Sequence, residues 1–234
     1  MAFSPLIPFS RGIMTPVLLV VSAALAACLY LVGLALDMFW LKLLTKPWLV
    51  IALATTVWTH AGTAAGRRIA WGLLAGAVGD VCLALPNAFL PGMIAFAIGH
   101  GLYVAAFVQW SRIPAPALLL PVALFAGTGL WLMLPGAGAL TLPLTVYVVV
   151  IGAMIWRAAA CALETQDDVL MRWGPLAGAL LFGFSDFLIG IHRFHQPMPG
   201  AAFSIILTYW AGQALFAATA IRRTVQATEI GQNA

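Results

Sequence analysis

The sequence is poor in charge. Only 8% of its 234 residues are Asp, Glu, Lys or Arg, whereas 63% are hydrophobic. A soluble domain carries roughly 25% charged residues, so this composition excludes a soluble globular enzyme with an ordinary surface. It predicts an all-α polytopic membrane protein in which residues 1–234 form a single integral membrane domain.

Several functional motifs are also absent. The three cysteines have no CxxC spacing, and the chain has no P-loop, glycine-rich dinucleotide turn, nucleophilic serine motif or metalloprotease helix. These absences argue against ATP, NAD and acyl-enzyme chemistry, and no cofactor is expected. The basic residues occur singly or in pairs near span ends, which favours lipid headgroups over nucleic acid as their partners.

The apolar stretches predict a bundle of eight transmembrane helices. The expected spans are 15–36, 47–60, 69–86, 89–110, 117–134, 140–157, 172–192 and 201–221, and the second is expected to start at Lys46-Pro47 because proline suits a helix N-terminus.

An even number of spans puts both termini on one side of the membrane. The basic residues expected on that side are Arg11, Arg67, Arg68, Arg112, Arg157, Arg172, Arg222 and Arg223, against Lys42, Lys46 and Arg193 on the other. The excess predicts that both termini face the cytoplasm, in a bacterial inner membrane.

Asp80 and Asp186 lie inside the long apolar stretches 73–85 and 180–190. A carboxylate at that depth costs several kcal/mol unless it is paired, hydrated or protonated. Two carboxyls in one site of low dielectric would divide the roles, one keeping its proton and the other staying charged. This pair would suit general acid–base hydrolysis. The alternative is that each aspartate pairs privately, for example with His100 or a tyrosine, and only fixes helix packing.

The two aspartates also suggest an internal repeat. Their helices are four apart in the expected order, and each aspartate lies about six residues, or about 9 Å, before the outer helix end. His100 follows Asp80 by 20 residues, and Tyr209 follows Asp186 by 23. A parallel four-plus-four repeat would bring both carboxyls to one depth near a pseudo-twofold axis.

Four further polar residues lie in apolar helices. His100 and Tyr103 are three residues apart, and Tyr209 and Gln213 are four apart, so each pair shares a helix face. These residues either line a substrate cavity or hold neighbouring helices together by hydrogen bonds.

Basic residues and histidines gather near the outer ends of the expected spans. Lys46 and Arg193 could bind a lipid phosphate at the mouth of the cavity, or they could simply mark the interface and snorkel. His192 and His195 have metal-ligand types but no third ligand at a convincing spacing, so no metal site is expected.

In their order and spacing, the short motifs that contain these residues resemble those of the YhhN family of integral membrane proteins. The resemblance rests on 79–86 with Asp80, 96–103 with His100, 184–188 with Asp186, Arg193-Phe194, Lys46-Pro47, and Tyr209 with Gln213, and it covers about 42–221. It implies hydrolysis of the vinyl ether bond of a lysoplasmalogen or a related lysophospholipid, giving a fatty aldehyde and glycerophosphoethanolamine or glycerophosphocholine. It also implies that Asp80 and Asp186 match the family's candidate catalytic acids.

The chemistry of a vinyl ether fits two carboxyl groups. Protonation of the terminal alkene carbon gives an oxocarbenium ion, which water traps, as in glycosidases. One aspartate would donate the proton and the other would stabilise the cation and orient the water; the sequence leaves open which does which.

Two other functions remain open: a proton- or cation-coupled transporter, against which the unbroken helices around both aspartates argue, and a lipid-binding scaffold. The sequence carries no signal for an oligomeric state.

Overall fold

The computed structural model describes residues 11–165 and 167–232, and the part that it describes is helical and contains no strand. This confirms the all-α class. The helices are α1 (Arg11–Ala35), α2 (Phe39–His60), α3 (Ala64–Ala84), α4 (Phe89–Trp110), α5 (Leu119–Ala137), α6 (Thr141–Ala162), α7 (Val169–Phe194) and α8 (Ala201–Gln232). Short 3₁₀ turns, Pro116–Leu118 and Gly138–Leu140, flank α5.

Six stretches of the described chain are long and apolar enough to cross a membrane, which makes this a multi-pass membrane protein. They are Val17–Ala35, Phe39–His60, Phe89–Trp110, Pro116–Ala162, Val169–Phe194 and Ala201–Glu229. The fourth is 47 residues long and contains both α5 and α6. The helix α3 falls outside this set, and its sequence includes Arg67, Arg68 and Asp80.

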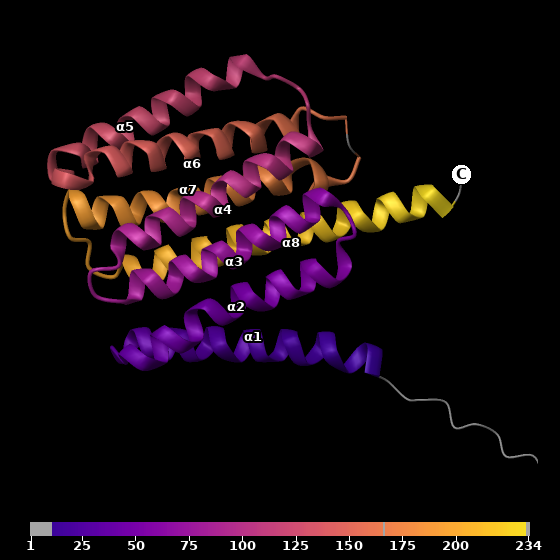
Figure 1. Cartoon of the computed structure of the whole chain (residues 1–234), viewed down its shortest axis with the longest axis horizontal. Coiled ribbons are helices and arrows are strands. Elements are labelled where there is room, and N and C mark those ends of the chain that lie inside the picture. The colour runs from indigo at the N-terminus through magenta and orange to yellow at the C-terminus, as the bar shows by residue number, and fades with distance from the viewer. Residues whose placement is uncertain (1–10, 166, 233–234) are drawn as a thin grey trace, which may run out of the picture.

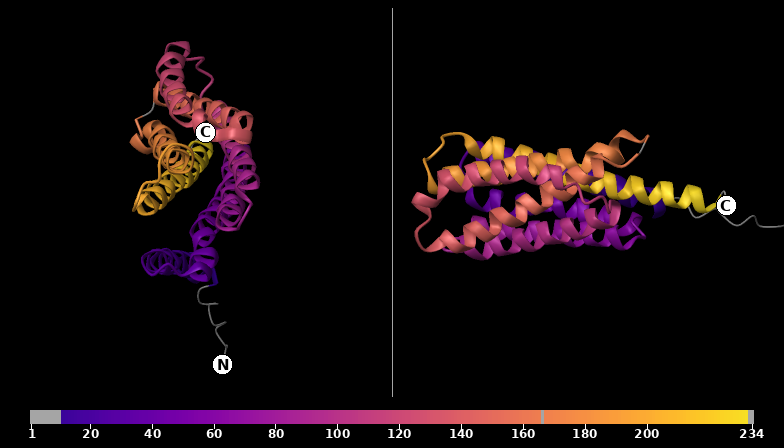
Figure 2. Two further views of the ribbon diagram at one scale, coloured as in Figure 1. Left: turned by 90° about the vertical axis from the view of Figure 1, so that its left-hand side faces the viewer. Right: turned by 90° about the horizontal axis from the view of Figure 1, so that it is seen from above.

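The helices lie side by side in a curved row with a second layer on its concave side. The row runs α1, α2, α3, α4, α6, α5, and α7 and α8 fill the hollow (Figures 1 and 2). The helix α8 packs against α2 and α3, and α7 packs against α5 and α6. The start of α1 and the end of α8 lie at the same end of the bundle, on the right in Figure 1.

The second helix begins earlier than its proline suggested. The prediction of a start at residue 47 is wrong, because α2 begins at Phe39 and passes through Pro47. Membrane helices tolerate an internal proline where other groups satisfy the freed backbone, and the mostly apolar residues 39–45 before Pro47 continue the same helix. Lys46 therefore lies seven residues inside the helix, about 10 Å from its start.

Other helix ends also fall outside the predicted spans. The helix α5 continues through Pro135 to Ala137, and the turn begins only at Gly138, whose φ is +52°. The helix α7 starts at Val169 because Asp168 Oδ1 accepts a hydrogen bond from the Met171 backbone N–H at 3.0 Å. That bond and the Arg222 guanidinium hold the pKa of Asp168 below its usual value.

Candidate active site

Asp80 and Asp186 lie at the same end of the bundle, opposite the end where α1 starts and α8 finishes (Figure 1). The carboxyl-terminal parts of α3 and α7, which carry them, meet the amino-terminal parts of α2, α4, α6 and α8 at this end. These helices supply the side chains that surround the two carboxyl groups.

Asp80 is buried and forms an ion pair. It is 1% exposed, and Lys46 Nζ lies 3.0 Å from its Oδ1. The Tyr209 hydroxyl donates a hydrogen bond to the other carboxylate oxygen at 2.8 Å. A buried carboxylate is tolerated when a cation and hydrogen bonds compensate it, so this arrangement suits an ionised Asp80.

Asp186 has different partners. The Tyr147 hydroxyl donates to Asp186 Oδ2 at 3.0 Å, and His100 Nε2 lies 3.4 Å from the same oxygen. His100 is fully buried, and neither of its ring nitrogens has a partner with hydrogen-bond geometry in the described part of the chain. Among residues 11–165 and 167–232, no lysine or arginine lies within 4.0 Å of the Asp186 carboxyl. A buried carboxyl without such a cation is favoured in its neutral form.

Packed aromatic rings join the two carboxyl clusters. The ring centroid of Phe182 lies 4.6 Å from His100 and 5.1 Å from Tyr209. Phe96 lies 5.9 Å from Tyr209 and 6.0 Å from Phe182. The two aspartates thus occupy adjacent clusters, each with its own partners. Private pairing of this kind is also what the packing alternative expects.

A glycine face on α3 lets these side chains approach the helix closely. A Cβ at Gly76 would come within 2.9 Å of Gln213 Nε2 and 3.0 Å of the Tyr209 oxygen. A Cβ at Gly79 would come within 2.6 Å of the Phe96 ring. The absence of a side chain at Gly76 leaves room for the Tyr209 hydroxyl beside Asp80, and its absence at Gly79 leaves room for the Phe96 ring.

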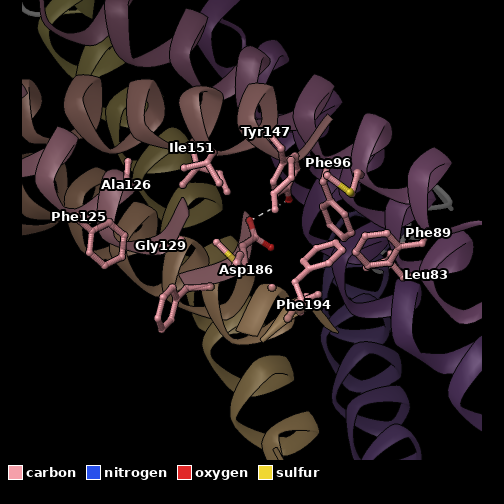
Figure 3. A pocket seen from close by; sticks show the side chains of 18 residues that line it. Leu83, Phe89, Phe96, Phe125, Ala126, Gly129, Tyr147, Ile151, Asp186 and Phe194 are labelled. Carbon is pink, nitrogen blue, oxygen red and sulfur yellow. Dashed lines mark hydrogen bonds between the residues drawn. The ribbon is translucent and has the colours of Figure 1, made fainter. Parts of the chain in front are cut away.

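Two cavities reach this end of the bundle. The first, here named the apolar slot, has a volume of about 60 Å³ and contains Asp186 and Tyr147 in an otherwise apolar lining (Figure 3). The second, named the vestibule, has a volume of about 240 Å³. Its polar lining residues are Tyr30, Lys46, His192 and Arg193. Leu83, Phe89 and Ile189 line both cavities and form the boundary between them.

The other predicted site residues divide between the vestibule and the protein interior. Lys46 and Arg193 both line the vestibule, and the Arg193 guanidinium lies 4.9 Å from the centroid of the Phe89 ring. Tyr103 and Gln213 hydrogen bond to each other at 2.7 Å, and neither lines the slot or the vestibule. Their position favours a role in holding α4 against α8.

Sequence reasoning missed Tyr147. Its hydroxyl is the closest hydrogen-bond donor to Asp186, yet the sequence patterns did not mark it as a site residue. The signal was present, because Tyr147 is the one polar residue in the apolar run 146–151. A hydroxyl buried in such a helix needs a partner, and the nearby intramembrane carboxyl supplies one.

The histidines at the carboxyl-terminal end of α7 do not form part of a larger ligand group in the described chain. His192 Nδ1 accepts a hydrogen bond from the Met198 backbone N–H at 2.9 Å, which fastens the α7–α8 connection. Within the chain that the structure describes, no three or more His, Cys, Asp or Glu residues lie close enough to hold a metal ion.

Fold and site together define a multi-pass helical membrane protein with two buried aspartates at one end of its bundle. Comparison with known proteins identifies the class more closely. The chain belongs to the YhhN family, whose model matches residues 41–220.

Named relatives cover most of the chain. It is 37% identical over 192 residues to lysoplasmalogenase TMEM86B of Homo sapiens, which covers 81% of this chain and 80% of that protein. It is 37% identical over 160 residues to lysoplasmalogenase TMEM86A of Bos taurus, covering 66% and 65% of the two chains. A lysoplasmalogenase of Mycobacterium bovis is 34% identical over 167 residues, covering 65% and 61%. No solved structure matches.

The transporter alternative gains no support from these findings. All three of these relatives carry the name of an enzyme, and both α3 and α7 run as continuous helices through their aspartates. The broken helices that build many transporter sites are not found at either carboxyl.

Proposed function

We propose that this protein is a membrane hydrolase that cleaves the vinyl ether bond of lysoplasmalogens or closely related lysophospholipids. The products are a fatty aldehyde and glycerophosphoethanolamine or glycerophosphocholine. The proposal is supported by family membership and by the lysoplasmalogenase names of relatives that align with most of the chain. It uses the protein's own carboxyl groups and no cofactor.

The observation that carries the proposal is the unequal surroundings of the two aspartates. Asp80 has the Lys46 ammonium at 3.0 Å, whereas Asp186 has the Tyr147 hydroxyl and sits in the apolar slot. A charged carboxylate and a neutral carboxylic acid are the two groups that vinyl ether hydrolysis requires. We therefore assign Asp186 as the proton donor and Asp80 as the anion.

The reaction follows from this assignment. Asp186 transfers its proton to the alkene carbon that is not bonded to oxygen, and the adjacent carbon and ether oxygen share the positive charge of an oxocarbenium ion. The Asp80 carboxylate stabilises that cation and orients a water molecule, which adds to the cationic carbon. The proton released from the water returns to Asp186, and the resulting hemiacetal collapses to the aldehyde and the glycerol hydroxyl. Apolar walls limit competing reactions with bulk water.

The two cavities suit the two parts of a single-chain lipid. The phosphate would lie in the vestibule near Lys46 and Arg193, and the hydrocarbon tail would lie in the apolar slot. The vinyl ether joins the polar and apolar parts of the molecule. It would then lie inside the slot, beside Asp186. His100 and Tyr209 would hold the carboxyl groups in position, and Tyr103 with Gln213 would support them through helix packing.

We further propose that the whole chain is one membrane domain with eight crossings in a parallel four-plus-four repeat. In such a repeat α2 corresponds to α6, and α4 corresponds to α8. Asp80 meets Lys46 of α2 and Tyr209 of α8, and Asp186 meets Tyr147 of α6 and His100 of α4. This correspondence of partners supports the repeat.

The basic residues support an orientation. Arginines dominate the end of the bundle opposite the aspartates, as the positive-inside rule expects for a cytoplasmic face. Both termini would then face the cytoplasm of a bacterial inner membrane, and the vestibule would open on its outer side.

The direct test measures aldehyde release by the purified protein in detergent. We expect release from a 1-alkenyl lysophospholipid and none from the matching 1-acyl lysophospholipid, because only the former gives an oxocarbenium ion on protonation. A chelator should leave the rate unchanged. Release of fatty acid from the acyl lipid instead would contradict the proposal, and full inhibition by the chelator with recovery on adding zinc would require a metal mechanism.

The headgroup position predicts a binding effect at Arg193. Arg193→Gln should raise the KM by about tenfold while changing kcat little, because a hydrogen bond between charged groups contributes about 1.5–3 kcal/mol to binding. Lys42→Gln is the matched control, because Lys42 is a cation near the same end of the bundle that pairs with the exposed Asp37. If both variants keep the parent KM, the phosphate does not bind in the vestibule.

A further inference from the structure

The apolar slot extends away from the vestibule toward α5. Its lining on that side comes from three helices: Phe125, Ala126 and Gly129 of α5, Ile151 of α6, and Phe187 of α7. In Figure 3 Phe125, Ala126 and Gly129 lie on one side of Asp186, and Leu83, Phe89 and Phe194 lie on the other. The acid therefore stands partway along the slot, with only hydrocarbon surface beyond it.

The α5 wall of the slot contains two very small residues between Phe125 and Met133. Ala126 has a methyl group and Gly129 has no side chain. A Cβ at Gly129 would meet Met133 Cε at 3.4 Å and the Phe187 ring at 3.7 Å, which are ordinary contacts. A methyl group is therefore accommodated there, but a longer side chain would enter the slot. The space beyond Asp186 depends on this position remaining small.

We propose that the apolar slot binds the hydrocarbon tail of the substrate and that Gly129 sets the longest tail that fits. This inference rests on the proposed function, because the tail is oriented by placing the vinyl ether at Asp186 and the phosphate in the vestibule. A tail that starts at Asp186 and runs away from the vestibule has to pass the α5 wall. Substrates with long 1-alkenyl chains would use the space that Gly129 leaves.

The test compares chain-length preference in Gly129→Leu and the parent. We expect the ratio of kcat/KM for a dodecenyl over an octadecenyl lysophospholipid to rise by about tenfold or more in the variant, since one methylene in an apolar pocket changes kcat/KM by about 10–200-fold. Gly127→Leu is the matched control on the same helix, because a Cβ at Gly127 has no atom within 4 Å and so points away from the slot. Its ratio should equal that of the parent.

Ala126→Leu provides a second obstruction of the same wall if Gly129→Leu does not fold. The two should shift the ratio in the same direction, and a parent-like ratio in a folded Gly129→Leu or Ala126→Leu protein would overturn the inference.

Binding separates this inference from the proposed function. The affinity for non-cleavable 1-alkyl lysophospholipids with dodecyl and octadecyl chains is measured in both proteins. A selective loss of octadecyl binding in Gly129→Leu supports the tail site even if the parent cleaves no substrate, in which case only the proposed function fails. If Gly129→Leu weakens the binding of the dodecyl and octadecyl lipids equally, the tail site is overturned, whereas the proposed hydrolase function still stands.

Discussion

Asp186→Asn should lower aldehyde release by about 10²–10⁴-fold, the usual contribution of a general acid. Asparagine matches the size of aspartate and can still accept the Tyr147 hydrogen bond, which is 3.0 Å long in the parent. The variant should therefore fold and bind substrate while lacking the proton. The measurement is kcat for a 1-alkenyl lysophospholipid, with the denaturation midpoint as the check on folding.

Two further variants test this prediction, one as a control and one at the partner of Asp186. Asp37→Asn removes an exposed carboxylate near the same end of the bundle and should leave kcat unchanged. Tyr147→Phe removes the hydroxyl that holds Asp186 and should lower kcat by about fivefold, since a buried hydrogen bond contributes about 1 kcal/mol. An Asp186→Asn protein with more than a tenth of the parent kcat would remove Asp186 from the role of acid.

Lys46→Met should destabilise the protein by about 3–5 kcal/mol, because it leaves the Asp80 carboxylate buried without its cation. Methionine keeps much of the length of the lysine stem, so the loss reports charge more than volume. The effect is read as a fall in the free energy of unfolding in detergent. Lys42→Met, which breaks an exposed pair, should leave the denaturation midpoint unchanged.

The double variant Lys46→Met with Asp80→Asn separates stability from catalysis. Removing both charges should restore most of the lost stability, because no buried charge is then left without an oppositely charged partner. Turnover should stay low, since the anion of the proposed mechanism is gone. If the double variant regains both stability and kcat, Asp80 and Lys46 are a packing device, and the Asp80 part of the mechanism is wrong.

The composition and the apolar pattern were sufficient to predict the helical class and most helix positions. The start of α2 was not, because Pro47 favours a first helical turn, whereas a membrane helix tolerates an internal proline and here continues through the mostly apolar residues 39–45. That one boundary has a large consequence. With the helix extended to Phe39, Lys46 moves from an interfacial position to the interior, where its side chain is 16% exposed and reaches Asp80.

The candidate site was partly predictable for a different reason. An aspartate in an apolar helix stands out because burial of its charge is costly, so Asp80 and Asp186 were found from sequence. A tyrosine carries no such cost, and Tyr147 was overlooked. His100 and a tyrosine were expected as possible partners, but which aspartate takes which partner depends on which helices pack together: α2 and α8 at Asp80, and α6 and α4 at Asp186.

The two cavities face different surroundings, and this has a consequence for the order of events after cleavage. The slot reaches Phe125, which is 47% exposed on the flank of α5, whereas the vestibule is lined by Lys46 and Arg193. The hydrophobic aldehyde would leave laterally into the lipid bilayer, and the water-soluble phosphodiester would diffuse out of the vestibule past the basic residues. Neither product would have to wait for the other. Because the two products would leave by different routes, accumulation of the phosphodiester at the vestibule would not keep the aldehyde in the slot.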